Sequence, residues 1–209
     1  MSPGRALVLV LVGAGAWAIL PDGRAGAGDA DAGRAVFVAK QCDRCHLPRT
    51  ERGPAPALED IRRPQGEMEL AGRLWNHLPA MFASLTEKGA GWPRISNTEM
   101  GDLMAYLQAD PARDPEPDLF RGQVILLRKG CLKCHSLRGE GGPVKPDLAE
   151  RRTDYESAAA WAVTMWTHTP RMAAAASRQG LPYPRFSSDE MVNLVGLLRS
   201  AALAQPPRR

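Results

Sequence analysis

All four cysteines and two of the four histidines of this chain lie in two copies of one five-residue pattern. Residues 42–46 read CDRCH, and residues 131–135 read CLKCH. C-x-x-C-H is the attachment sequence of c-type haem, because its two thiols form thioethers with the haem vinyl groups and its spacing holds the next imidazole beneath the iron. The motifs therefore predict two covalently bound haem c groups. The predicted attachment residues are Cys42, Cys45, Cys131 and Cys134, and the predicted iron-ligating histidines are His46 and His135.

Two other kinds of chemistry are open to four cysteines. In an exported chain they could form two disulfide bonds, although Cys-x-x-Cys pairs are usually redox-active and would not require the following histidine. The same thiols could hold one zinc ion tetrahedrally, but each pair lies in its own copy of a repeat. Haem attachment accounts for every residue of the pattern, so we favour it.

The repeat extends well beyond the cysteine motifs. Gly33 and Gly122 each lie nine residues before the first cysteine of their motif. Further on, WNHLPAM at 75–81 matches WTHTPRM at 166–172, and WPRISNTEMGDLMAYL is followed later by YPRFSSDEMVNLVGLL. Two homologous units of about 85 residues are the simplest interpretation.

The stretch between the two units is rich in proline. Its three prolines disfavour a continuing helix and favour an extended spacer. The expected organisation is a first domain at 28–110, a linker at 111–118 and a second domain at 119–205.

Each unit is expected to be all-α, because its apolar residues recur at helical spacing. One helix precedes Cys42, and a second carries Leu70, Leu74 and Trp75 on one stripe. Trp75 and its counterpart Trp166 are interpreted as helix-face core residues, for which packing on a porphyrin would be a special case. A third helix begins with an S-x-x-E capping box at Ser96 and Glu99, and Ser187 and Glu190 repeat that pattern.

The repeated stretches around Trp75 and Trp166 also offer a second ligand to each iron. Two methionines are paired between the units and follow a proline by two residues, where we expect the chain to leave the second helix and turn a thioether toward the iron. Two histidines, four residues before these methionines, are paired as well, and imidazole is an excellent iron ligand. The predicted distal ligands are Met81 and Met172, with His77 and His168 as the alternatives.

The N-terminus has the composition of an export signal. Residues 6–20 are uncharged and apolar, they follow Arg5, and small residues come after them. Fifteen helical residues rise only about 22 Å, less than the hydrocarbon core of a membrane. We therefore expect a signal peptide at 1–27, with an uncleaved membrane tether through residues 6–20 as the alternative.

The rest of the composition is that of an ordinary soluble globular protein, with 44% hydrophobic and 24% charged residues. The formal net charge of +4 comes from charges scattered along the chain, without a run of five or six like charges. Nucleic acid is therefore not expected as a partner.

Across residues 30–205 the sequence resembles the class I cytochromes c in a tandem two-haem arrangement. The resemblance rests on the two C-x-x-C-H motifs, the following paired methionines and the order of the helices. It implies, for each unit, an N-terminal helix bearing the motif, a C-terminal helix that crosses it, and a distal methionine between them.

A haem iron that the protein ligates on both faces has no vacant position for oxygen or peroxide, so its expected reaction is one-electron exchange. The sequence thus predicts a periplasmic electron carrier, not an enzyme, that passes single electrons between a donor and an acceptor redox protein. A dihaem oxidoreductase, such as a peroxidase or a thiosulfate dehydrogenase, is the alternative. The cytochrome subunit of a larger respiratory complex is another.

Overall fold

The computed structural model describes residues 28–187 and 189–205, and this part of the chain is mostly helical. The predicted export signal at 1–27 lies outside the described residues. The all-α expectation is confirmed at this level. The first half contains α1 (Ala30–Ala39), α2 (Leu58–Ile61), α3 (Glu67–Glu87) and α4 (Asn97–Tyr106). The second half contains α5 (Leu119–Arg128), β1 (Ser136–Leu137), β2 (Glu140–Gly141), α6 (Ala158–Arg178) and α7 (Glu190–Leu203).

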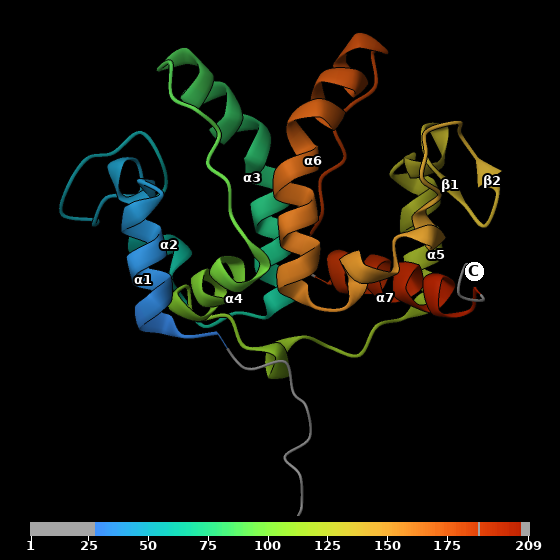
Figure 1. Ribbon diagram of the computed structural model, residues 1–209, viewed down its shortest axis with the longest axis horizontal. Coiled ribbons are helices and arrows are strands. Elements are labelled where there is room, and N and C mark those ends of the chain that lie inside the picture. Colours follow the sequence, from blue (N-terminus) through green and yellow to red (C-terminus); the bar gives the residue numbers. More distant parts are fainter. Residues whose placement is uncertain (1–27, 188, 206–209) are drawn as a thin grey trace, which may run out of the picture.

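The two halves repeat one arrangement around a central helix pair. In Figure 1, α3 and α6 lie side by side at the centre and diverge toward their C-terminal ends. In the first half α1 packs on α4, and in the second half α5 packs on α7. Across the centre, α4 packs on α6 and α7 packs on α3, so each outer pair contacts the long central helix of the opposite half.

The outer pairs cross closely at the glycines that the repeat had aligned. A Cβ atom added to Gly33 of α1 would come within 1.9 Å of the carbonyl oxygen of Asp102 in α4. A Cβ atom on Gly122 of α5 would come within 2.3 Å of the carbonyl oxygen of Asn193 in α7. Only glycine permits these backbone contacts, which set each motif-bearing helix against the C-terminal helix of its half.

A small antiparallel hairpin is the one strand pairing among the described elements, and the sequence had not predicted it. Ser136 pairs with Gly141, and Leu137 pairs with Glu140. Between the strands, Arg138 and Gly139 both have positive φ, at 55° and 87°, which suits a tight two-residue hairpin turn. Strands of two residues are too short to produce an alternating pattern in the sequence.

The prediction that the chain leaves the second helix at Pro79 and Pro170 is wrong. Both prolines lie inside long helices, Pro79 in α3 and Pro170 in α6. Met81 therefore lies within α3 rather than in a loop, and Met172 lies within α6.

The helices continue because other residues take up the hydrogen bonds that proline cannot make. A proline inside a helix lacks the N–H that would bond the carbonyl four residues earlier. The Trp75 carbonyl, four residues before Pro79, accepts a hydrogen bond from the Tyr183 hydroxyl at 3.3 Å. The Trp166 carbonyl, four residues before Pro170, accepts one from Trp92 Nε1 at 3.1 Å. Each donor comes from the opposite half of the chain. The carbonyl that each proline leaves without a helical partner is therefore satisfied only when the two halves are in contact.

The interface between the halves is part of one continuous hydrophobic core. Trp75 Nε1 donates to the Pro184 carbonyl at 2.7 Å, and Trp166 Nε1 donates to the Pro93 carbonyl at the same distance. The buried core residues of both halves form a single packed cluster. The predicted units at 28–110 and 119–205 thus share a core, although each carries its own motif.

Candidate functional site

The two C-x-x-C-H segments have the same backbone conformation. Each begins after a residue in the left-handed region, Gln41 with φ 61° in the first half and Gly130 with φ 73° in the second. A short 3-10 turn follows at Cys42–Arg44 and at Cys131–Lys133. Hydrogen bonds then run from the histidine N–H to the first cysteine carbonyl, at 3.0 Å for His46 and 2.9 Å for His135. The turn therefore places each histidine next to its cysteine pair.

All four cysteines are free thiols and partly buried. Burial raises the pKa of Cys42 to about 11, and Asp43 contributes in the same direction. Burial likewise raises the pKa of Cys131 to about 11. Both thiols are thus protonated at neutral pH.

In the first half, His46 is oriented by a backbone carbonyl. Its Nδ1 lies 2.9 Å from the Pro56 carbonyl oxygen. Because a carbonyl only accepts hydrogen bonds, Nδ1 carries a proton, which leaves Nε2 as the ring nitrogen that could ligate a metal. An imidazole whose other nitrogen is fixed in this way is typical of a metal ligand.

His77 of α3 lies opposite His46. The two ring centroids are 5.9 Å apart, and His77 Nε2 is buried without a hydrogen-bond partner. Burial lowers the pKa of His77, and the nearby His46 lowers it further, so both effects favour the neutral ring. A buried, unpaired nitrogen of this kind is costly unless a ligand satisfies it.

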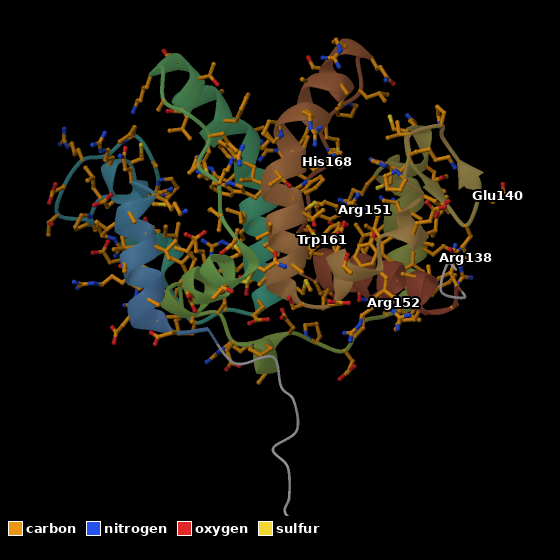
Figure 2. All side chains as sticks on the ribbon, viewed as in Figure 1. Arg138, Glu140, Arg151, Arg152, Trp161 and His168 are labelled. Atoms are coloured by element: carbon orange, nitrogen blue, oxygen red, sulfur yellow. The ribbon has the colours of Figure 1, made fainter. Side chains whose placement is uncertain are left out.

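The second half repeats this arrangement. The rings of His135 and His168 also lie 5.9 Å apart, centroid to centroid. Burial lowers the pKa of both histidines, and the positive charge of Arg151 contributes to the lowering in each. Arg151 lies between α6 and α5 (Figure 2). The predicted motif histidines and the alternative distal histidines are therefore brought together in both halves.

A mostly apolar cavity of about 330 Å³ opens beside His46 and His77 in the first half. Cys42 and Met81 line it as well, so four of the candidate haem-binding residues share one cavity. The remaining lining residues are Phe37, Pro56, Ile61, Leu70, Arg73, Leu74, Asn76, Ile95, Met100, Leu103, Met104, Leu107 and Trp166.

Two members of that lining were not expected there: Arg73 was not singled out from the sequence, and Trp166 was expected to pack within its own unit. Arg73 is partly buried, which lowers its pKa, and it donates to Gln65 and to the Asp60 carbonyl at 3.0 Å. It brings a positive charge to an otherwise apolar wall. Trp166 comes from α6 of the other half, and no local pattern could have indicated that it reaches this cavity.

These residues fit a haem. The cavity falls within the usual size range of cofactor pockets, it is lined mainly by apolar side chains, and Cys42 lies on its wall. One imidazole offers a free Nε2 from the motif side, and a second nitrogen without a partner lies across from it. Cys42, Cys45 and His46 would hold the group on one side, with His77 or Met81 on the other.

No group of three or more His, Cys, Asp or Glu side chains that could bind a metal ion occurs within 28–187 and 189–205. Over the same residues, no helix has the length and apolar character needed to cross a membrane.

The comparisons with known proteins add no relative. The chain matches no protein-family model, and no curated protein or solved structure is detectably similar to it.

Proposed function

We propose that this protein is a dihaem c-type cytochrome of the tandem class I kind, which transfers single electrons between redox partner proteins in the periplasm. The observation that carries the proposal is the pair of facing histidines behind each C-x-x-C-H motif, with ring centroids 5.9 Å apart in both halves. When bound, a haem c at each site would supply reversible one-electron exchange at its iron.

The protein contributes attachment, ligation and exclusion of water. The two cysteines of each motif would anchor the group, and the motif histidine would ligate its iron. In the first half, Phe37, Leu78 and Met104 belong to a core that is almost entirely closed to solvent, which favours electron exchange over reaction with small molecules.

The distal ligand is a choice between two residues on the same helix. The sequence favours Met81 and Met172 through the resemblance to class I cytochromes c, but the expected loop around them does not exist. His77 lies across from His46 with an unpaired nitrogen, and metal–imidazole bonds of about 2 Å would suit two rings separated in this way. The geometry therefore favours His77 and His168, with Met81 and Met172 one helical turn further on as the alternative.

A second function is a dihaem oxidoreductase, such as a peroxidase or a thiosulfate dehydrogenase, in which one iron keeps an open position. The equal histidine separations in the two halves do not support such a division of labour. A cytochrome subunit of a larger respiratory complex would use the same two sites. It would differ from a free carrier in being bound to the other subunits of that complex.

Covalent attachment is tested by haem extraction. Acid–acetone treatment of the purified protein should leave two haems per chain bound. Extractable haem, or protein that takes up none, contradicts the proposal. The mature protein should begin near Gly28, and its intact mass would reveal whether residues 6–20 remain as a membrane tether.

The distal ligand is tested by matched substitutions. If His77 ligates, His77→Ala should open the first iron to carbon monoxide, whereas Met81→Ala should not. If Met81 ligates, the oxidised protein shows a weak far-red sulfur-to-iron band, and Met81→Ala removes about half of it. His168→Ala and Met172→Ala provide the same comparison at the second site. Wild-type protein that readily binds carbon monoxide at one iron would favour the oxidoreductase.

A further inference from the structure

Trp166 contributes to a cavity that belongs to the other half of the chain. It lies in α6, yet its side chain lines the first cavity beside His77 and Met81. Only 3% of Trp166 is exposed. The first cavity is therefore closed by a residue that the first half of the sequence does not contain.

Residues of the first half hold the Trp166 ring firmly. Its ring is stacked on that of Trp92, with centroids 4.4 Å apart and an interplanar angle of 27°. Its Nε1 donates to the Pro93 carbonyl at 2.7 Å, and its own carbonyl accepts a hydrogen bond from Trp92 Nε1. The stack and the Nε1 hydrogen bond hold the side chain, and the third contact holds the backbone of the same residue.

The same turn of α6 also reaches the second site. His168 lies two residues after Trp166, and residues two apart in a helix point to nearly opposite sides. Trp166 accordingly points to the first cavity, while the ring of His168 faces His135 of the second half. One turn of a single helix thus contacts both candidate haem sites.

We propose that Trp166 is the bridge through which electrons pass between the two haem sites, so that the chain is one internal relay rather than two independent carriers. The proposal rests on the dihaem function proposed above. In each transfer, one site is oxidised by one electron and the other is reduced by that electron. The Trp166 ring serves as the medium between them, and it is neither oxidised nor deprotonated.

The repeat-related tryptophan, Trp75, has similar contacts. Trp75 of α3 stacks on Tyr183 with centroids 5.1 Å apart, and its Nε1 donates to the Pro184 carbonyl at 2.7 Å. The Trp92–Trp166 stack is closer, and Trp166 is the residue that lines the cavity. The transfer route is assigned to Trp166 because its side chain lines the described cavity beside His77.

The test uses proton NMR of the complete dihaem protein. In the oxidised state, the paramagnetically shifted haem methyl signals form two sets, and Phe37→Leu identifies the first set because Phe37 lines the first cavity. Trp166→Phe should move the first set, although residue 166 belongs to the second half. In half-reduced protein, electron exchange between the two haems of one molecule does not depend on protein concentration. The rate of this exchange should fall severalfold in Trp166→Phe and further in Trp166→Leu. It should be closest to the wild-type rate in Trp166→Tyr.

Trp161→Phe is the matched control. Trp161 lies in the same helix, is similarly buried at 6% exposure, and donates to Met191 Sδ at 3.2 Å within the second half. It should leave both the first signal set and the exchange rate unchanged.

Two outcomes would overturn the bridge. One is an exchange rate that is the same in Trp166→Phe and wild type. The other is an equal slowing in Trp161→Phe, which would indicate general loosening of α6. If Trp166→Leu does not fold, the tyrosine and phenylalanine variants still decide the question. Wild-type protein without bound haem would instead refute the proposed function.

Discussion

The two halves hold their histidine pairs at the same separation, but they build the loops after the motifs differently. In the first half, the loop carries Pro56, whose carbonyl orients His46. In the second half, a hairpin follows the motif, and the buried Asp147 accepts backbone hydrogen bonds from Arg138, Gly139 and Ala149. The shared feature is the packing of the helices, so the helices rather than the loops set the distance between the rings.

The halves also differ in charge. Residues 28–110 contain ten basic and twelve acidic side chains, whereas residues 119–205 contain twelve basic and seven acidic ones. The second half is therefore positive and the first slightly negative. An asymmetry of this kind directs partners of opposite charge to opposite halves, with a dependence on ionic strength.

The largest expected effect comes from removing one attachment site at a time. Cys42→Ala with Cys45→Ala should remove one haem, and Cys131→Ala with Cys134→Ala should remove the other. Because the halves share one core, each double variant should also lower the melting temperature of the half that keeps its haem. Haem stoichiometry and thermal melts followed by circular dichroism measure both effects. An unchanged melt of the loaded half would show that the two halves are independent.

A second comparison concerns matched buried positions in α3 and α6. Leu78 and Thr169 correspond in the repeat, and both are fully buried. Leu78→Ala should lower the free energy of unfolding by about 2–5 kcal/mol through loss of apolar packing. Thr169→Val should cost about 1 kcal/mol, because the Thr169 hydroxyl only contacts the Tyr183 hydroxyl, at 3.4 Å. Urea denaturation measures both, and equal losses would contradict the ranking.

Asp147→Asn tests the loop that is particular to the second half. Loss of the charge-assisted hydrogen bonds should cost about 1–3 kcal/mol at neutral pH.

The pH dependence gives this prediction a second readout. Burial alone raises the pKa of Asp147, but its hydrogen bonds, chiefly from the N–H groups of Gly139 and Ala149, outweigh burial and hold the pKa below its usual 3.8. Since the folded state has the lower pKa, the stabilisation is complete above 3.8 and is lost as the pH falls through the folded-state value. The stability difference between wild type and variant should therefore shrink in acid. A difference that grows in acid would refute this role.

The smallest effect distinguishes two helix starts that look alike in sequence. Ser96 and Glu99 form a complete capping box on α4, so Ser96→Ala should cost about 1 kcal/mol. In the second half, Ser187 and Glu190 are hydrogen-bonded to each other, but the N-cap of α7 is Asp189. Ser187→Ala should therefore cost less than Ser96→Ala in the same denaturation assay.

Local signals made much of this fold predictable. The helix before Cys42, the capping box at Ser96 and the cysteine–histidine motifs depend on neighbouring residues, and the described helices agree with them. The unbroken helices around Pro79 and Pro170 were not predictable, because the donors that satisfy the Trp75 and Trp166 carbonyls lie 108 and 74 residues away in the sequence.

The candidate site, too, was predictable from the sequence only in part. Its cysteines and histidines follow from motif spacing, whereas the position of Trp166 in the first cavity follows only from how α3 and α6 pack. Arg73 was missed for a similar reason, since a single arginine on a helix carries no sequence signal that it borders a cavity.

The two proline-containing helices have a consequence for how the chain is assembled. The hydrogen bond that completes α3 comes from Tyr183, 108 residues after Trp75, and the wall of the first cavity needs Trp166. During synthesis, the first half emerges long before either residue does, so its folding finishes only after the second half has been made. A fragment that ends in the linker at 111–118 should accordingly not be a stable single-haem protein, even though it contains a complete motif and both candidate distal ligands.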